Sequence, residues 1–288
     1  MPIALQENNK TAVVYLVWIP YGLGLFKNFI RSYQQFIPGA IHQLVLLFNG
    51  VNQEEDTIPY ITYARESNLK FETLSLDNGQ DIEAYFFAAG KLSVEFILFL
   101  NSYAEILSSD WLKKYAQAFE KQPGTGIVGS SGSMQSYYSS VFQKNTRYWE
   151  KTKGFYYNFR KYKLFIKAFV IWRFLFKPFP NPSIRTNAFM VRRTDFLKIY
   201  PGRVNSKFRA YRFESGKKSM TNYFIRNGMR PLIIDKKGKT YEIEDWVKSS
   251  TFWIDNQENL LVSDNQTEIY RKSGKEERKL MTKLAWGI

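Results

Sequence analysis

The stretch Val94-Glu-Phe-Ile-Leu-Phe-Leu-Asn-Ser-Tyr-Ala-Glu-Ile106 decides the fold class of this chain. Its apolar run, Phe96 to Leu100, predicts a strand that is buried on both faces. The run ends abruptly in Asn101-Ser102-Tyr103, and a helix start follows at Ser108-Ser109-Asp110. A buried strand that ends in small polar side chains is typical of open α/β sheets, which bind ligands at the carboxyl ends of their strands.

The same alternation of strand and helix continues on both sides of this stretch. Short apolar runs predict the strands, and apolar residues at helical spacing predict the helices. We expect strands at 12–18, 42–48, 70–76, 94–101, 125–129, 185–192 and 231–234, and helices at 25–36, 61–67, 82–91, 111–121, 220–227 and at the chain end. This order predicts an α/β fold with a doubly wound, mostly parallel sheet and helices on both faces.

The composition excludes several kinds of chemistry. The chain of 288 residues has no cysteine, which removes disulfides, thiolate zinc sites and a thiol nucleophile. His42 is the single histidine, so mechanisms that need two histidines are excluded. It opens a predicted strand and is expected to be structural. The chain contains no phosphate-loop motif, and Gly22-Leu-Gly24 lacks the third glycine of a dinucleotide fingerprint.

Charge is distributed very unevenly along the chain. Residues 1–133 carry a net charge of −4 and residues 134–288 a net charge of +19. Residues 134–180 hold ten Lys/Arg against the single Glu150 and are rich in aromatic residues, which predicts a basic aromatic helical insertion. Three partners fit it: an anionic membrane surface contacted through 144–177, the protein's own core, or RNA, which we favour least because no RNA-binding signature accompanies it.

The location expected from the sequence is cytoplasmic, with peripheral contact to the inner face of the membrane. The first ten residues have no hydrophobic signal core, and no apolar run reaches the length of a membrane-spanning helix. The segment Leu164 to Phe176 is too short and too charged to cross a bilayer.

Several short motifs occur in an order that resembles a known family. Pro20-Tyr-Gly22, Asn49-Gly50, Asn78-Gly-Gln-Asp81 and Phe99-Leu-Asn-Ser-Tyr103 follow successive strands, as in the N-terminal half of family-two-type inverting glycosyltransferases of the GT-A fold. The chain is most similar to a bacterial branch with Asn-Ser-Tyr in place of Asp-x-Asp. The pieces that carry this further likeness are Asp81-Ile-Glu-Ala-Tyr85, Phe99 to Glu105, Arg185-Thr-Asn-Ala-Phe189, Phe213-Glu-Ser-Gly216 and Leu261 to Thr267.

The resemblance implies one GT-A-like domain over residues 1–288. Residues 1–133 would form its nucleotide-binding half, 134–180 the insertion, and 181–288 the acceptor half and tail. It also implies a nucleotide-sugar donor, held by Pro20, Gly22, Asn49, Gly50, Asp81, Asn101, Ser102, Tyr103 and Arg185. Two of these assignments have alternatives, since Asn49-Gly50 also suits an ordinary turn and Asp81 also suits a helix cap.

The strand end bears directly on metal binding. In the family, Asp-x-Asp binds the divalent metal and the donor, whereas Asn101 and Ser102 offer only neutral oxygens. We therefore expect weak or absent Mn²⁺ or Mg²⁺ binding, with Arg185 and Arg192 neutralising the diphosphate instead. Glu105 or Asp264 could restore a metal site, although Glu105 also suits a solvent-facing position. A Ser102→Asp change is predicted to raise manganese affinity.

The resemblance further implies the catalytic and acceptor residues. Inverting transfer needs a carboxylate base, and Glu214 lies in a predicted loop before a helix, where the family has it; Asp264 is the second candidate. Glu214 could alternatively be a carboxylate that favours the helix entry. The acceptor side would be lined by Ser130 and Ser131, in a flexible polar loop over 130–133, and by Thr186 and Asn187.

The function that we favour from the sequence is inverting transfer of a sugar from a nucleotide donor to a hydroxyl of a lipid-linked or surface glycan. Two alternatives belong to other classes. One is a catalytically inactive binding protein on the GT-A fold, which the missing Asp-x-Asp favours. The other is a membrane- or RNA-binding basic module, which the charge distribution favours.

Overall fold

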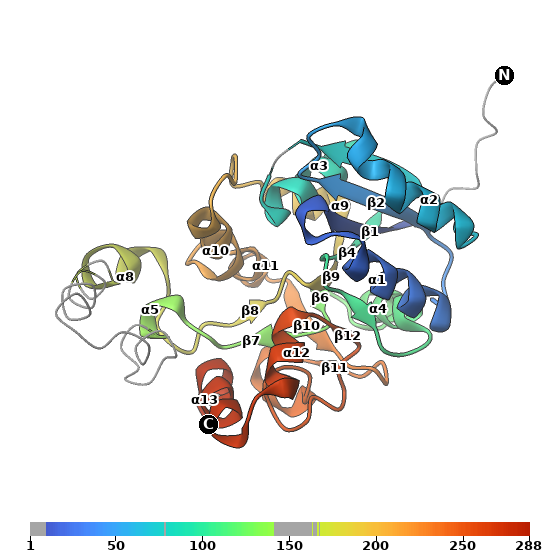
Figure 1. Cartoon of the computed structure of the whole chain (residues 1–288). Helices are drawn as coiled ribbons and strands as arrows, with labels where there is room; N and C mark the ends of the chain where they lie inside the picture. Colours follow the sequence, from blue (N-terminus) through green and yellow to red (C-terminus); the bar gives the residue numbers. More distant parts are fainter. Residues whose placement is uncertain (1–9, 78, 141–162, 164–165, 167) are drawn as a thin grey trace.

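The computed structural model describes residues 10–77, 79–140, 163, 166 and 168–288, and within them a large mixed sheet forms the centre of the molecule (Figure 1). Its strand order is β11-β10-β6-β9-β4-β1-β2-β3. Two short ribbons, β5 with β12 and β7 with β8, lie beside it. The strands are β1 (Thr11–Trp18), β2 (Gln43–Asn49), β3 (Glu72–Leu76), β4 (Phe96–Leu100), β5 (Glu105–Ile106), β6 (Thr125–Gly129), β7 (Gly132–Ser133), β8 (Ser183–Ile184), β9 (Ala188–Arg192), β10 (Arg230–Ile234), β11 (Thr240–Tyr241) and β12 (Val262–Ser263).

Helices cover both faces of the sheet. They are α1 (Leu23–Gln35), α2 (Ile58–Glu66), α3 (Asp81–Lys91), α4 (Trp111–Lys121), α5 (Tyr137–Ser140), α8 (Arg173–Leu175), α9 (Arg193–Lys198), α10 (Lys207–Ser215), α11 (Met220–Arg226), α12 (Asn265–Lys272) and α13 (Lys275–Trp286), with the shorter turns η1 (Ile19–Tyr21), η2 (Glu54–Thr57), η3 (Ala168–Trp172, a π-helical turn) and η4 (Ile243–Ser249). None of the helices in the described part of the chain is long and apolar enough to cross a membrane.

The continuous apolar run of β4 is explained by two cores, one on each face of the sheet. Successive side chains of a strand point to opposite faces, so Ile97 and Phe99 enter one core while Leu98 and Leu100 enter the other. The first core is shared with α3, α9 and α11, and the second with α1, α2 and α4. The predicted α/β sheet with helices on both faces is therefore confirmed.

One central strand runs against its neighbours. β1, β2, β3 and β4 pair in parallel, as do β6 and β10, whereas β9 is antiparallel to both β4 and β6. Ala188, the first residue of β9, therefore lies opposite Leu100, the last residue of β4. The start of β9 consequently shares an edge of the sheet with the carboxyl ends of β1 and β4.

Much of the predicted basic insertion lies outside the described residues. Of the range 134–180, the gaps cover 141–162, 164–165 and 167, which include most of the 144–177 segment expected to contact a membrane. The described remainder includes α5, η3 and α8. The division of the chain at 133/134 and 180/181 stays a prediction.

Candidate functional site

A cleft of about 790 Å³ opens at the sheet edge where β1 and β4 end and β9 begins. Helix α10 contributes one wall and the start of α12 another (Figure 1). Most of its polar lining comes from four places: the loop before α3, the end of β4, the β8–β9 connection and α10. These residues are Gly79, Gln80, Asp81, Asn101, Ser183, Arg185, Thr186, Asn187, Lys207, Glu214 and Ser215, with Asp264, Asn265 and Gln266 on the α12 side.

The polar triplet after β4 is bonded mainly to backbone. The Asn101 Oδ1 accepts from the Tyr103 N–H at 3.1 Å, and the Ser102 Oγ accepts from the Trp18 N–H at 3.2 Å. The buried Tyr15 hydroxyl donates to the Ser102 carbonyl at 2.8 Å. Among the three, only Asn101 lines the cleft. The expectation that all three side chains face the donor is therefore wrong, because the Ser102 hydroxyl joins the end of β4 to β1 and the Tyr103 ring packs against Tyr21.

The residues present do not form a typical divalent-metal site. Among the described residues, no cluster of three or more His, Cys, Asp or Glu side chains could hold an ion. Glu105 lies in β5, does not line the cleft, and accepts a hydrogen bond from the Asn28 Nδ2 at 3.1 Å. Its predicted role as a rescuing metal ligand is therefore wrong.

Three of the expected donor residues, Pro20, Gly22 and Gly50, lie behind the cleft wall. Pro20 lies in η1, next to Tyr21, and both Tyr21 and the nearby Trp18 line the cleft. Gly22 ends that turn with a φ of +73°. Gly50 has a φ of +76°, and a Cβ there would lie 3.0 Å from the Trp18 ring. At both positions the backbone conformation favours glycine.

Asn49 connects β2 to the loop that carries Asp81. Its Nδ2 donates to the Gly79 carbonyl at 2.9 Å, while its buried Oδ1 has no hydrogen-bond partner. Asn49 itself does not line the cleft.

Asp81 faces the cleft from the first turn of α3. The N-cap residue is Gln80, and no side chain caps this helix, so the alternative of Asp81 as a helix cap is wrong. Asp81 is exposed to the cleft, where desolvation by the surrounding protein raises the pKa of its carboxyl and the positive charge of Lys207 opposes that shift. The carboxylate also bonds to its own N–H in the first turn of α3, which opposes the rise in pKa, so Asp81 is part of that turn and also lines the cleft.

Glu214 lies near the end of α10 and not in the predicted loop before a helix. Ser206 caps the start of α10, and the neighbouring Phe213 packs its ring against Phe86, which anchors the last turn of the helix. The Thr186 Oγ1 donates to the Glu214 Oε1 at 2.5 Å. The local structure predicted for Glu214 was wrong, but its side chain does line the cleft.

The electrostatic environment of Glu214 disfavours its charge. Burial is the largest cause that raises the pKa of Glu214, and the negative charge of Asp81 raises it further. The hydrogen bond from Thr186 and the positive charge of Arg185 act in the opposite direction. Burial and the same two carboxylates also raise the pKa of Tyr85 well above its usual value. Groups of this kind in a cleft are typical of acid–base sites.

Arg185 joins the two sides of the cleft. Its guanidinium pairs with Asp264 at 2.5 Å, donates to the Ser131 Oγ at 3.3 Å and lies 4.1 Å from the Phe252 ring centroid. The other carboxylate oxygen of Asp264 caps α12 by accepting from the N–H groups of Gln266 and Thr267. Asp264 is therefore committed to structure, which argues against its predicted roles as base or metal ligand.

Arg192 is not part of the cleft. It lies at the far end of β9, where it donates to the Thr125 carbonyl at 3.2 Å and stacks near the rings of Phe96 and Phe119. The prediction that Arg192 neutralises a diphosphate is therefore wrong, because the antiparallel direction of β9 brings only its start to the ligand edge.

The serines after β6 form a buried network instead of a flexible loop. The Ser131 Oγ donates to the Asn187 Oδ1 at 3.1 Å, and the Asn187 Nδ2 donates to the Ser130 Oγ at 3.5 Å. Ser130 and Ser131 are fully buried and lie behind the cleft, whereas Thr186 and Asn187 line it. The predicted flexible loop is wrong, but the four predicted acceptor-side residues do lie together.

His42 lies away from the cleft in an aromatic environment. Its Nε2 is 2.7 Å from the Tyr33 hydroxyl and its Nδ1 is 3.0 Å from the Ala40 carbonyl. Burial lowers the pKa of His42. The ring is thus held by packing and hydrogen bonds, as expected of a structural histidine.

The aromatic lining and one cation of the cleft were not predicted from the sequence. Tyr21 could have been predicted, because it follows Pro20 in the motif that was identified after β1. The other missed residues have no local sequence pattern that marks them, because they come from segments that are distant in the sequence. The missed lining residues are Trp18, Tyr21, Tyr137, Lys207, Tyr211, Phe252 and Trp253.

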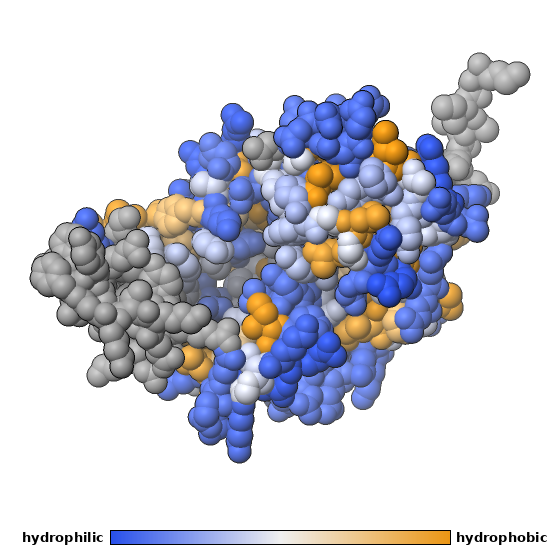
Figure 2. Space-filling view, in the orientation of Figure 1, coloured by the Kyte–Doolittle hydropathy of each residue, from blue (hydrophilic) through white to orange (hydrophobic). Residues whose placement is uncertain are grey.

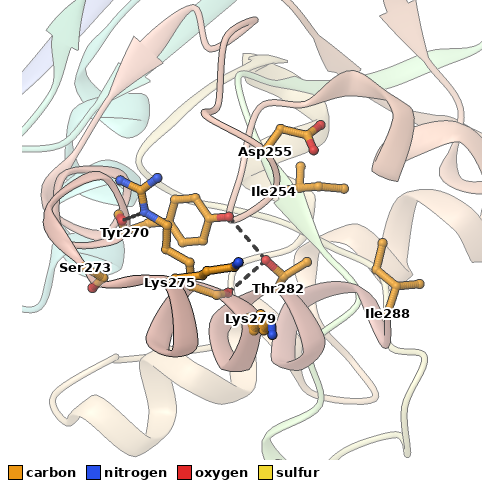
Figure 3. A pocket seen from close by; sticks show the side chains of 9 residues that line it. Ile254, Asp255, Tyr270, Ser273, Lys275, Lys279, Thr282 and Ile288 are labelled. Carbon is orange, nitrogen blue, oxygen red and sulfur yellow. Dashed lines mark hydrogen bonds between the residues drawn. The ribbon is translucent and has the colours of Figure 1, made fainter.

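A second pocket, of about 630 Å³, lies against α12 and α13 (Figure 3). There the Tyr270 hydroxyl is 3.3 Å from the Thr282 Oγ1, and the Arg278 Nε donates to the Tyr270 carbonyl at 3.0 Å. These bonds join the end of α12 to α13, and Asp255 is the one carboxylate among the lining residues. We therefore place the functional site in the larger cleft, which has a perturbed pair of carboxylates.

Comparisons with known proteins identify the fold. No family model matches the sequence, and no curated protein matches it. A solved structure of GalNAc-T7 with UDP, GalNAc and Mn²⁺ is 14% identical, covers 94% of this chain and 50% of that chain, and has a TM-score of 0.50. The galactosyltransferase LgtC, with donor and acceptor sugar analogs, is 9% identical over 82% of this chain and 69% of that chain, with a TM-score of 0.38.

A third structure, S. aureus TarS 1-349 with UDP-GlcNAc, is 17% identical over 42% of this chain and 33% of that chain, with a TM-score of 0.33. The matched region thus spans half the length of GalNAc-T7 and a third of that TarS chain. The likeness to GalNAc-T7 shows that this chain has the GT-A fold of glycosyltransferases.

Proposed function

We propose that the protein is a glycosyltransferase that moves a sugar from a nucleotide-sugar donor to a hydroxyl acceptor with inversion. The observation that carries this proposal is the Glu214 carboxylate in the cleft, hydrogen-bonded by Thr186 and coupled to Asp81. The GT-A fold, shared with a structure that contains UDP, GalNAc and Mn²⁺, supports a nucleotide-sugar donor.

Glu214 acts as the general base. It removes the proton from the acceptor hydroxyl as that oxygen forms a bond to the anomeric carbon of the donor sugar, and the bond from that carbon to the phosphate breaks. The nucleoside diphosphate leaves with the electron pair. The raised pKa of Glu214 makes it a stronger proton acceptor once ionised, and the Thr186 hydroxyl fixes the direction of its carboxylate.

The donor lies across the ends of β1 and β4. Trp18 and Tyr21 offer aromatic surface for the nucleobase, and Asp81 accepts hydrogen bonds from the ribose hydroxyls. Arg185 and Lys207 face the same cleft and offset the charge of the diphosphate. Among the described residues, no cluster of three or more His, Cys, Asp or Glu side chains could hold an ion, so each step of this proposal is assigned to the chain's own side chains.

The acceptor approaches from the side of α10. Thr186 and Asn187 line that side together with Tyr137 and Tyr211, whose rings stack at a centroid distance of 5.3 Å. Aromatic faces and hydrogen-bonding side chains are the usual means of holding a sugar ring. We propose a hydroxyl of a lipid-linked or surface glycan as the acceptor.

A second candidate function is favoured by one specific observation. The Asn101–Tyr103 triplet replaces Asp-x-Asp, and the Asn101 and Ser102 side chains accept hydrogen bonds from backbone N–H groups. A protein that binds a nucleotide sugar without transferring it would also fit this arrangement. The two candidate functions differ in turnover: the enzyme needs the Glu214 carboxylate for sugar transfer, whereas the binding protein transfers no sugar.

The test uses the purified chain with a panel of UDP-, GDP- and dTDP-sugars. Calorimetry with and without Mn²⁺ measures donor binding, and release of nucleoside diphosphate measures turnover. The proposal expects one donor to bind and to be hydrolysed slowly in the absence of acceptor. If no donor binds, both candidates fail, and if a donor binds without any turnover, the binding protein is the better description.

A further inference from the structure

The helical segment Ala168–Leu175, formed by η3 and α8, has a buried face and an exposed face. On the buried side, Trp172 and Phe176 form a small apolar cluster with Tyr137 and Phe208. The Trp172 and Phe176 rings lie 4.6 and 5.2 Å from the ring of Tyr137. This cluster attaches the segment to the wall of the cleft, so its orientation on the molecule is fixed.

The opposite side presents large apolar side chains to solvent. Ile166, Val170, Ile171 and Phe174 are 45%, 55%, 48% and 63% exposed. Val170 and Phe174 are four residues apart and therefore lie on the same side of the segment, and Ile166 precedes it in the chain. We call these four residues the apolar stripe. In Figure 2, hydrophobic surface appears beside the grey atoms at the left end of the molecule, near α8 and α10.

Positive charge surrounds the apolar stripe. Arg173 belongs to the same segment, Lys163 lies earlier in the chain, and both are exposed. The N–H of Lys217 donates to the Leu175 carbonyl at 2.7 Å, which brings the exposed Lys217 to the end of the segment. Residues 163–177 contain no Asp or Glu. We call Lys163, Arg173 and Lys217 the basic rim.

We propose that the apolar stripe and its basic rim form a docking surface for an anionic lipid bilayer. Exposed aliphatic side chains insert among the acyl chains near the headgroups, while lysine and arginine contact the lipid phosphates. The described segment has no acidic residue to repel that surface, and it is not long and apolar enough to span it. Nucleic acid fits less well, because Ile166, Val170 and Ile171 offer no ring on which a base could stack.

This surface adjoins the cleft. Tyr137 contacts Trp172 on one side and lines the cleft on the other, where it stacks with Tyr211. Docking through the apolar stripe would therefore bring the α10 side of the cleft close to the membrane. It follows, resting on the proposed function, that the acceptor is a hydroxyl carried at a lipid surface.

The experiment is co-sedimentation of the whole chain with vesicles of phosphatidylcholine alone or mixed with phosphatidylglycerol. We expect binding to the mixed vesicles only, weakened as salt increases. Phe174→Asp is expected to reduce the partition coefficient at least about tenfold, and Lys217→Glu about fivefold or more. The matched control is Ile41→Asp, an 83% exposed isoleucine before β2, at the opposite edge of the sheet from the cleft.

Three results would overturn the proposal: no binding to the mixed vesicles, equal binding to both kinds of vesicle, or equal loss of binding in Ile41→Asp and Phe174→Asp. Thermal unfolding checks that all three variants remain folded, which their exposed positions favour. Donor calorimetry on the same samples separates this question from the enzymatic one. Phe174→Asp should leave donor affinity unchanged, whereas failure of the proposed function would appear as absent donor binding in the unsubstituted chain.

Discussion

Two parts of the same cleft differ in how their polar side chains are used. At the end of β4, the Asn101 and Ser102 side chains are neutral and bond to nearby backbone. Across the cleft, Glu214 and Asp81 are carboxylates whose pKa values are raised by desolvation, and Arg185 is held in place by Asp264. The first part fixes the ends of strands, whereas the second concentrates charge where a ligand can reach it.

This difference supports the location proposed for the chemistry. In this chain the strand end that carries Asp-x-Asp in the resembling family supports the backbone, and α3, α10 and the β8–β9 connection supply the charged side chains Asp81, Glu214 and Arg185. Substitutions in the two parts should therefore have effects of different kinds and sizes.

The largest expected effect is on turnover in Glu214→Gln. Loss of the general base should lower kcat by about 10³-fold, while donor affinity stays nearly the same. Glu120→Gln, at an exposed position in α4, is the matched control and should keep full activity. If the measured turnover is unchanged in Glu214→Gln, Glu214 is not the general base.

The same variant has a second readout in stability. Because burial raises the pKa of Glu214, the folded protein binds this proton more tightly than the unfolded chain does. Stability therefore falls as pH rises from the unfolded pKa through the folded one. Glu214→Gln should lose that part of the pH dependence, measured by denaturant unfolding at several pH values.

The next largest effect is expected for Asp264→Ala. This change leaves the mostly buried Arg185 without its ion pair, since that side chain is only 17% exposed, and it removes the cap of α12. The free energy of unfolding should fall by about 3 kcal/mol. Glu268→Ala, which breaks exposed pairs on the same helix, should cost less than about 1 kcal/mol. Similar losses in urea unfolding would mean that the Arg185 pair is no more important than a surface pair.

A pair of substitutions should move the pH profile of kcat in opposite directions. Thr186→Val removes a hydrogen bond that lowers the pKa of Glu214, so the acid limb should move to higher pH. Asp81→Asn removes a negative charge that raises the same pKa, so the limb should move to lower pH. Saturating donor keeps weaker binding out of the comparison, and Thr186→Ser should restore the original profile. Shifts of the same sign would contradict the assignment of the limb to Glu214.

The smallest effect is expected at the end of β4. Ser102→Asp is predicted from the sequence to raise manganese affinity. The Ser102 side chain, however, is buried, accepts a hydrogen bond from the Trp18 N–H and does not line the cleft. The structure therefore leads us to expect no change in Mn²⁺ affinity by calorimetry. Asn101→Asp, at the neighbouring cleft-lining position, is the informative comparison. A clear gain in Ser102→Asp alone would show that its side chain reaches the ligand.

The sheet was predictable because its signal is local. Buried parallel strands need apolar residues on both faces, and the run from Phe96 to Leu100 has no other simple explanation. The order of strands and helices followed from the same patterns. The direction of β9 could not be predicted, since an apolar run is equally compatible with a parallel and an antiparallel strand. The incorrect role of Arg192 follows from that ambiguity.

The cleft was predictable only in part. Asp81, Arg185, Thr186 and Glu214 were found through short motifs, and their side chains do line it. The local structure of Glu214 was missed because helix α10 is mostly polar and has a weak apolar pattern. The burial of Ser130 and Ser131 was also missed. Serine-rich stretches usually form exposed loops, and here only packing between distant segments buries them.

Helix α13 has a consequence for how this protein should be handled. The Trp286 Nε1 donates to the Phe252 carbonyl at 2.6 Å, and Phe252 stacks on Arg185 at the floor of the cleft. The N–H of Met134 donates to the Ala285 carbonyl at 2.9 Å, which ties the same helix to the strand leading into α5. A deletion that removes α13 would break both hydrogen bonds and leave Phe252, a ring that lines the cleft, without this support.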